Sequence, residues 1–208
     1  MKTQVWAHRG ASAYAPENTL EAFRLAAEMG ADGVELDVQL SRDGELVVAH
    51  DETIDRVSNG TGYIKDYTLA QLKKLSFNRL FPDFKDARIP TLKEVYELLK
   101  PAGLTVNVEL KTGIILYPEI EEKVLALTAS MGMEDRVIYS SFCHPSLVRL
   151  KELDSGLKTG LLYSDGWIDA AAYGRHTVGA DALHPALYHM QDPDLIPAAR
   201  RQGLAVNV

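Results

Sequence analysis

The sequence predicts an α/β protein built on a parallel sheet, and three observations lead to that fold class. Short apolar runs with strand composition alternate with amphipathic segments of helical period. The order strand, helix, strand recurs along the chain, and it is the repeating unit of a parallel α/β fold. With 208 residues, of which 46% are hydrophobic, the chain can bury one sizeable core. We therefore expect a single domain over residues 1–208.

The first strand–helix–strand unit lies at the N-terminus. Residues 4–8 have the pattern of a short buried strand. A helix follows, for which Asn18 can serve as the cap and Glu21 as the third helical residue of a capping box. Gly30 suits its C-terminal stop. Residues 33–38 then form the second strand.

Asp43-Gly44 separates two stretches that can pair as a hairpin. If these two residues form the whole loop, Asp37 pairs with His50, and Glu35 lies on the same face of the sheet. The return limb, residues 46–49, follows too closely to be a parallel neighbour, because a parallel crossover needs a dozen or more residues. We expect a hairpin arm there.

Beyond the hairpin, residues 52–90 are irregular, with a short capped helix near Thr68, and we expect them to be an insertion. Thr91 and Glu94 form a capping box that opens the next helix. Strands and helices then alternate to the end of the chain, the last helix being capped by Asp192. A (β/α)₈ barrel has eight strands, and we expect the chain to stop before the eighth. The seven expected strands are 4–8, 33–38, 104–109, 136–141, 158–163, 181–184 and 204–208.

The composition restricts the partners and the location of the protein. A net charge of −7 gives no general attraction for nucleic acid or for an anionic membrane. Cys143 is the only cysteine, which fits a reducing compartment. No apolar run approaches the length of a membrane span, so we expect a cytoplasmic protein without stable membrane insertion. The oligomeric state stays open.

Polar side chains gather where the expected strands end. Active sites of (β/α)₈ barrels lie at the C-terminal ends of the strands, so these side chains are expected to converge on one rim. His50 returns to the same rim through the hairpin. The polar residues at the strand ends are His8, Arg9, Glu35, Asp37, Glu109, Lys111, Ser140, Ser141 and His184. His184 could line the pocket, but Pro185 beside it makes a turn role as plausible.

Glu35, Asp37 and Glu109 supply three oxygen donors without a neighbouring cysteine. Such a set favours a hard divalent cation, Mg²⁺, Ca²⁺ or Mn²⁺, over zinc. Three acids crowded at one mouth would repel one another unless a cation lay between them. The alternative is a set of solvated surface carboxylates, and the pattern alone leaves both open.

The basic candidates each have two interpretations as well. His8 and His50 can form an acid–base pair, because imidazole exchanges protons near neutral pH. They can equally be two histidines held by ordinary hydrogen bonds. Arg9 offers a planar fork and Lys111 a point charge for a phosphate, although either alone is more often a solvated surface charge.

Taken together, these segments resemble the glycerophosphodiester phosphodiesterases, and the resemblance spans the whole chain. Each segment alone is a weak signal, but the combination is specific. Members of that family usually continue past this point to a final strand. The matching segments are His8-Arg9-Gly10, Pro16-Glu17-Asn18-Thr19, Gly30 to Val38, Asp43-Gly44, Val47 to Asp51, Val108 to Lys111, and Ser141-Phe142.

The resemblance implies a (β/α)₈ TIM barrel with an insertion after the second strand. It also implies roles for the candidate residues. Glu35, Asp37 and Glu109 match the metal ligands of the family. His8 and His50 match its catalytic histidines. Arg9 and Lys111 match its phosphate-binding cations.

The implied reaction is metal-dependent hydrolysis of glycerophosphodiesters to sn-glycerol 3-phosphate and an alcohol. The cofactor would be Mg²⁺ or Ca²⁺, with Mn²⁺ also allowed. Two alternatives stay open: a related phosphodiesterase acting on lysophospholipids or phosphoinositides, and a non-catalytic barrel that binds phosphodiesters. Residues 76–84 are mildly apolar and could form a lip for a lipid substrate.

Overall fold

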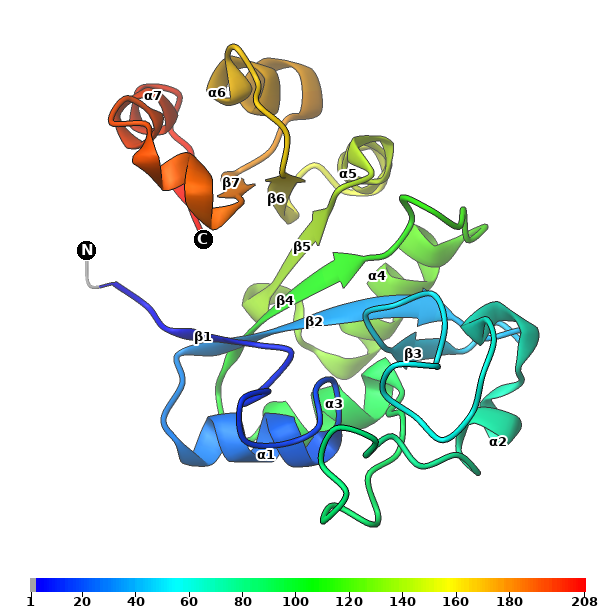
Figure 1. The fold of residues 1–208 in the computed structure, drawn as a ribbon. Helices are drawn as coiled ribbons and strands as arrows, with labels where there is room; N and C mark the ends of the chain where they lie inside the picture. Colours follow the sequence, from blue (N-terminus) through cyan, green and yellow to red (C-terminus); the bar gives the residue numbers. More distant parts are fainter. Residues whose placement is uncertain (1–2) are drawn as a thin grey trace. The chain divides into compact units, whose positions relative to one another are not determined.

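The computed structural model describes residues 3–208, which fall into two compact units. The first unit ends at Val137, and the second runs from Ile138 to Val208. Strands and helices alternate in both units, as the sequence predicts (Figure 1). The expectation of a single domain stays a prediction.

The first unit is organised around β2 (Gly33–Leu40). Its neighbours β1 (Trp6–His8) and β4 (Thr105–Leu110) run parallel to it, and β3 (Leu46–Val48) pairs antiparallel with its last residues. Helix α1 packs against α3, and α3 against α4 (Figure 1). The helical elements are α1 (Leu20–Glu28), α2 (Leu69–Leu72), α3 (Leu92–Leu99), α4 (Ile120–Met131), η1 (Ile64–Asp66) and η2 (Glu134–Arg136).

Strand β2 separates an apolar face from a polar face by simple alternation. Val34, Leu36 and Val38 are fully buried, and they make the strand part of the core. The intervening positions carry Glu35, Asp37 and Gln39, so their side chains share the opposite face of β2. That polar face carries the candidate site.

The expected register of the hairpin is wrong by one residue. Val38 pairs with Val48 and Leu40 with Leu46, which sets Asp37 opposite Ala49 instead of His50. The loop has three residues between Ser41 and Glu45, because Gly44 adopts a left-handed conformation (φ 79°). Such a turn with a glycine bulge is a common alternative to a two-residue loop. His50 therefore lies beyond the paired strand. The interpretation of β3 as an arm antiparallel to β2 is confirmed.

The cap of α1 also differs from the prediction. Thr19 is the capping residue, and its hydroxyl accepts a hydrogen bond from the N–H of Ala22. Asn18 instead has φ 55°, and its side chain turns toward β2. The predicted capping box at Thr91 and Glu94 is confirmed, with both reciprocal hydrogen bonds present.

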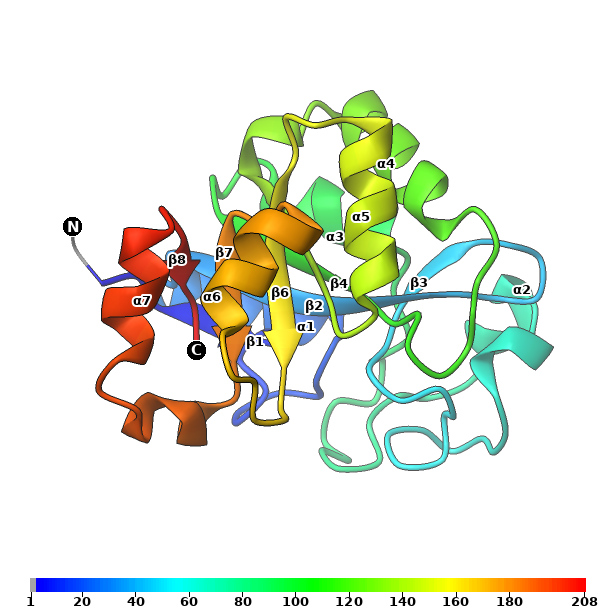
Figure 2. The same ribbon diagram turned by 90° about the horizontal axis from the view of Figure 1, so that it is seen from above.

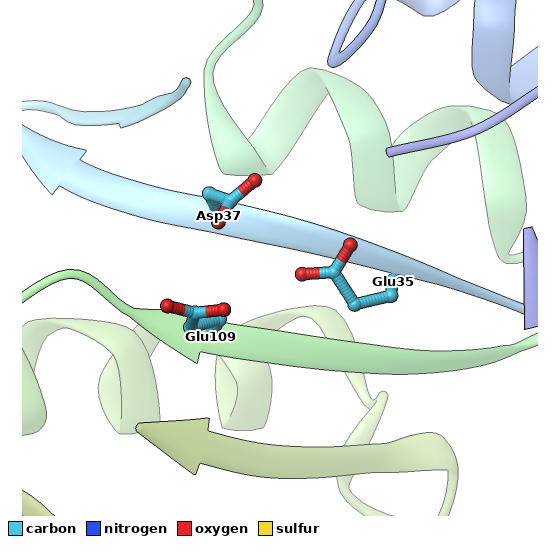
Figure 3. A group of neighbouring side chains, drawn as sticks. All are labelled: Glu35, Asp37 and Glu109. Carbon is cyan, nitrogen blue, oxygen red and sulfur yellow. The ribbon is translucent and has the colours of Figure 1, made fainter. Parts of the chain in front are cut away.

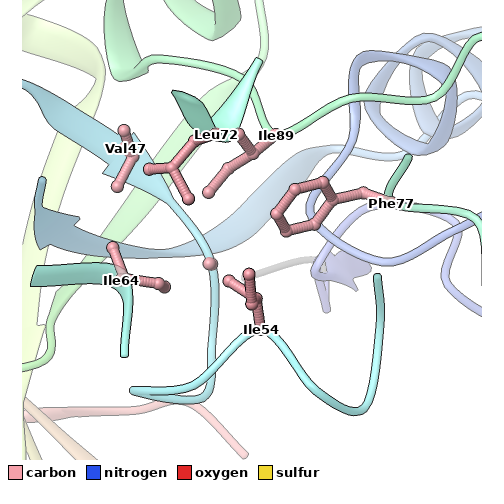
Figure 4. Close-up of a cluster of buried hydrophobic side chains, with 7 residues drawn as sticks. Val47, Ile54, Ile64, Leu72, Phe77 and Ile89 are labelled. Atoms are coloured by element: carbon pink, nitrogen blue, oxygen red, sulfur yellow. The ribbon is translucent and has the colours of Figure 1, made fainter. Parts of the chain in front are cut away.

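The insertion after β3 has a small core of its own. Figure 4 shows Val47 of β3 facing apolar side chains of the insertion. This packing fixes the chain on both sides of His50, because Ala49 and Ile54 both belong to the cluster. The buried members are Val47, Ala49, Ile54, Ile64, Leu72, Phe77 and Ile89.

The second unit carries four parallel strands in chain order. Helix α5 packs on β6, and α7 packs on β8 (Figure 2). The predicted cap of α7 at Asp192 is wrong, because Asp194 is the residue before the first turn. The carboxylate of Asp192 instead accepts a hydrogen bond from the backbone N–H of Asp194. The elements are β5 (Val137–Ser141), β6 (Lys158–Tyr163), β7 (Ala182–Pro185), β8 (Ala205–Val206), α5 (His144–Leu153), α6 (Ala170–Ala172), the π-helix η3 (Tyr173–Val178), η4 (Leu187–Gln191) and α7 (Leu195–Arg201).

Within residues 3–208, none of the helices combines the length and the apolar character that crossing a bilayer requires. The predicted cytoplasmic location stays a prediction.

Candidate active site

The register of the parallel strands brings three carboxylates together in the first unit. Asp37 of β2 pairs with Glu109 of β4, and Glu35 precedes Asp37 by two residues on the same face. Carboxylate oxygens of the three residues all lie within 4.8 Å of one another. Figure 3 shows the three groups on β2 and β4. We call Glu35, Asp37 and Glu109 the carboxylate cluster.

The carboxylate cluster holds more negative charge than its surroundings balance. Burial, together with the charges of Asp37 and Glu109, raises the pKa of Glu35 well above its ordinary value. Burial and the charge of Asp37 raise the pKa of Glu109 to about 7. One carboxylate oxygen each of Glu35 and Asp37 is buried without a hydrogen-bond partner. Three hard oxygen donors with unsatisfied atoms fit a divalent cation such as Mg²⁺, Ca²⁺ or Mn²⁺.

Two cations flank the carboxylate cluster. Lys111 Nζ lies 3.1 Å from a carboxylate oxygen of Glu109 and 3.9 Å from one of Asp37. Arg9 Nε lies 3.7 Å from the other oxygen of Asp37. The backbone N–H of Arg9 also donates to the carboxylate of Glu35 at 3.1 Å. Both positive side chains therefore border the carboxylate cluster.

His8 lies beside the carboxylate cluster at the end of β1. The strand register pairs it with Glu35, and its Nε2 lies 3.7 Å from a carboxylate oxygen of that residue. Its side chain is 69% exposed, so a substrate can reach it. Partial loss of hydration and the positive charge of Arg9 lower the pKa of His8. The ring is thus suited to accept a proton near neutral pH.

His50 is oriented by a carboxylate of its own. Its Nδ1 is 2.7 Å from Asp51 Oδ1, which leaves Nε2 free for proton transfer. Burial opposes ionisation of Asp51, but hydrogen bonds from Arg56 and His50 outweigh it and lower its pKa to about 2. The charge of His50 also contributes to the lowered pKa of His8.

Arg56 links His50 to Arg9 through a chain of ion pairs. Its guanidinium donates two hydrogen bonds to Asp51 and two to Glu17. Glu17 in turn accepts a hydrogen bond from Arg9 at 3.0 Å. We call Arg9, Glu17, Asp51 and Arg56 the Arg56 network. It joins the segment after β1 with the segment after β3.

Comparison with known proteins identifies the family of this chain. The model of the glycerophosphoryl diester phosphodiesterase family matches residues 8–208. The chain belongs to that family. A glycerophosphodiester phosphodiesterase of Caldanaerobacter subterraneus subsp. tengcongensis is 47% identical over 98% of this chain and 84% of the relative.

Solved structures of the family share the fold. The glycerophosphodiester phosphodiesterase of Agrobacterium tumefaciens superposes with a TM-score of 0.84 at 33% identity, covering 99% of this chain and 85% of that chain. An Oleispira antarctica phosphodiesterase, solved with the product sn-glycerol-3-phosphate, superposes with a TM-score of 0.79 at 29% identity. The superposition covers 98% of this chain and 91% of that chain. These likenesses confirm the TIM-barrel fold class and the prediction of an enzyme, a phosphoric diester hydrolase.

All seven residues predicted from the sequence belong to the first unit, and the contacts above connect each of them to this site. Their individual roles stay predictions. The sequence reasoning missed Glu17, Asp51 and Arg56. Glu17 and Asp51 lie inside the segments that resemble the family, and Asp51 directly follows the predicted site residue His50. Their positions in those segments could have marked them as candidates. Arg56 lies in the irregular insertion, where no periodicity marks it.

Asn18 was also missed, because the sequence assigned it to helix capping. Its side-chain amide donates to Asp37 Oδ2 at 2.8 Å, and the residue is 4% exposed. This bond holds one oxygen of Asp37 and leaves the other toward Lys111. The left-handed backbone of Asn18 fits this role, since asparagine tolerates that conformation better than most residues.

His184, a further strand-end histidine, is a packing residue of the second unit. Its ring lies against Gly160, where any Cβ would overlap it, and its Nε2 is 2.8 Å from the amide of Asn207. Burial lowers the pKa of His184 to about 4, so the ring is neutral. A buried, neutral and hydrogen-bonded ring supports a structural role.

Proposed function

We propose that this enzyme hydrolyses glycerophosphodiesters to sn-glycerol 3-phosphate and an alcohol, with a divalent cation held by Glu35, Asp37 and Glu109. The observation that carries the proposal is the carboxylate cluster, with its carboxylate oxygens within 4.8 Å of one another and two buried oxygens without a hydrogen-bond partner. Membership of the family and the product complex of the Oleispira relative support the substrate class.

A bound divalent cation supplies Lewis acidity at a phosphoryl oxygen and lowers the pKa of a hydroxyl or water. The side chains of this chain do the rest. Arg9 and Lys111 bind the non-bridging phosphoryl oxygens and stabilise the charge that builds up in the transition state. Asn18 keeps Asp37 in one orientation through the hydrogen bond to its Oδ2.

The two histidines transfer the protons. His8 acts as the base, because its lowered pKa keeps the ring unprotonated at neutral pH. His50 acts as the acid that protonates the departing alkoxide from Nε2, while Asp51 holds Nδ1. The attacking oxygen comes either from water or from the 2-hydroxyl of the substrate glycerol. The second route passes through a cyclic phosphate.

The test is release of glycerol 3-phosphate from glycerophosphocholine with Mg²⁺, Ca²⁺ or Mn²⁺. Activity is expected with at least one of these ions and is expected to be lost in EDTA. Restoration by the same ion separates metal removal from damage to the protein. Absence of turnover with all three ions, or full turnover of an EDTA-dialysed sample, would contradict the proposal.

One observation favours lysophospholipids as a second substrate class. Ile114 and Leu116, in the loop that follows Lys111, are 77% and 79% exposed. The apolar lip expected at residues 76–84 is less suited, because Phe77 is buried in the core of the insertion. If the 113–116 loop contacts an acyl chain, Ile114→Ser with Leu116→Ser raises KM for lysophosphatidylcholine and leaves KM for glycerophosphocholine unchanged.

A further inference from the structure

His50 lies beyond the last regular hydrogen bond of its strand. Strand β3 ends at Val48, and the N–H of Ala49 donates to the carbonyl of Asp37 at 2.9 Å. The corrected register removes the strand pairing that was expected to fix His50 opposite Asp37. Something other than the β-ladder must hold this backbone in place.

The side chain of Gln39 meets that backbone directly. Its Nε2 lies 2.9, 3.2 and 2.7 Å from the carbonyl oxygens of Ala49, His50 and Asp51. Its Oε1 accepts a hydrogen bond from the hydroxyl of Tyr117 at 2.9 Å. The orientation of the amide follows from these partners, because the reverse orientation would set an oxygen against three carbonyls.

This contact is buried. Gln39 is 0% exposed and Tyr117 is 7% exposed. A buried hydrogen-bond network in which each group has its partner is rigid, and a lost partner leaves a desolvated polar atom behind. The network also connects three separate parts of the first unit, since Tyr117 belongs to the segment before α4 and Gln39 to β2.

We propose that Gln39, supported by Tyr117, is a positioning residue that fixes His50 relative to the carboxylate cluster. Gln39 follows Asp37 by two residues on the same strand and the same face, so β2 carries both the cluster and the group that holds His50. The inference rests on the proposed function, because it assigns a task in proton transfer by His50.

The expected effect is on the chemical step and not on substrate binding. A proton-transfer group must lie within hydrogen-bond reach of its target, and general acid–base catalysis contributes about 10²–10⁴-fold. Gln39→Met keeps the length of the side chain and removes all four hydrogen bonds. We expect it to lower the single-turnover rate by about 10–100-fold, with KM changed less than twofold. Tyr117→Phe removes only the hydroxyl and has a smaller effect of the same kind.

A double-mutant cycle with His50→Ala tests whether Gln39 acts through His50. If it does, adding Gln39→Met to His50→Ala lowers the single-turnover rate by less than about threefold. The same 10–100-fold loss in both backgrounds would contradict the proposal. So would a Gln39→Met variant that raises KM and leaves the rate unchanged.

Hydrogen exchange of the backbone amides in residues 49–53 gives a second readout, independent of turnover. Exchange is expected to rise in Gln39→Met. The matched control is Tyr96→Phe, which removes the buried hydroxyl that pairs with Thr128 between α3 and α4, and is expected to leave this segment unchanged. Unchanged exchange in Gln39→Met would overturn the positioning role. Absence of turnover in the wild type would contradict the proposed function instead, while the exchange result still decides the role of Gln39.

Discussion

The carboxylate cluster and the Arg56 network are two groups of charged residues in one unit. Both contain carboxylates that are removed from water, but only the Arg56 network compensates their charge with hydrogen-bonded guanidinium groups. In the Arg56 network, the guanidinium of Arg56 balances two carboxylates, and it lowers the pKa of both Glu17 and Asp51 against the effect of burial. In the carboxylate cluster, burial and mutual repulsion outweigh the effect of the neighbouring cations, and the pKa of Glu35 and of Glu109 rises.

The difference shows that the two regions have different tasks. A network that balances its own charge holds side chains in position without any ligand. A cluster whose acids raise one another's pKa stores repulsion, and a divalent cation placed among them relieves it. Under the proposed function, the Arg56 network orients the histidine and arginine side chains, and the carboxylate cluster would hold the cation. The following three predictions test this contrast.

The largest effect is expected from Asp37→Asn. This change removes the central charge of the carboxylate cluster, and we expect kcat/KM for glycerophosphocholine to fall by at least about 10³-fold, which corresponds to about 4 kcal/mol. Without metal, the variant is expected to unfold no more easily than the wild type, because repulsion within the cluster is relieved. Glu97→Gln, on the exposed face of α3, is the control and keeps full activity. If Asp37→Asn hydrolysed glycerophosphocholine with the kcat/KM of the wild type, the assignment of Asp37 to the site would be wrong.

The second prediction concerns pH and stability in EDTA. The pKa of Glu109 is about 7 in the folded protein and near 4.5 ordinarily, so the folded state holds the proton more tightly than the unfolded state. The contribution of Glu109 to the free energy of unfolding should therefore fall by about 3 kcal/mol as the pH rises from about 4.5 to 7, while that of His184, whose folded pKa of about 4 lies below the ordinary 6.5, rises over much of the same range. Urea unfolding of the wild type and of Glu109→Gln at pH 5 and pH 7.5 isolates the Glu109 contribution as the difference between the two proteins, because His184 contributes equally to both.

Asp51 has the opposite sign, and its effect appears at lower pH. Its pKa is about 2 when folded and 3.8 ordinarily, so its contribution is present above about pH 4 and is lost as the pH falls toward 2. A metal-free wild type that gains stability relative to Glu109→Gln between pH 5 and pH 7.5 would contradict the contrast between the two regions.

The smallest effect is expected from Arg56→Met. The substitution leaves Glu17 and Asp51 without their shared cation, so His50 and Arg9 are held less firmly. We expect kcat to fall by about tenfold, which corresponds to about 1.4 kcal/mol, while metal affinity stays unchanged. Lys65→Met, which removes an exposed pair with Asp66, is the matched control with no effect. A large loss of metal affinity in Arg56→Met would show that the two regions are not separate.

The sequence was sufficient for the parts of the molecule that depend on strand alternation. Glu35, Asp37 and Glu109 lie together because parallel register and a two-residue period put them there, and both can be read from apolar and polar spacing. The seven strands and the capping box of α3 follow from equally local signals.

The parts that the sequence did not predict depend on single turns and on long side chains. The left-handed Gly44 adds one residue to the hairpin loop and shifts its register, and two-residue and three-residue loops share the same Asp-Gly signal. The contacts of Gln39 and Arg56 join residues far apart in the chain, and no periodicity encodes them. The expected pairing of His50 with Asp37 is therefore wrong, and the catalytic role of His50 stays a prediction.

The most direct test of the central claim is a crystal structure of the protein soaked with Mn²⁺, with the ion located by its anomalous signal. We predict one ion among the carboxylate oxygens of Glu35, Asp37 and Glu109, and no ion at the Arg56 network. An ion bound elsewhere, with the carboxylate cluster empty under conditions in which glycerophosphocholine is hydrolysed, would contradict the account.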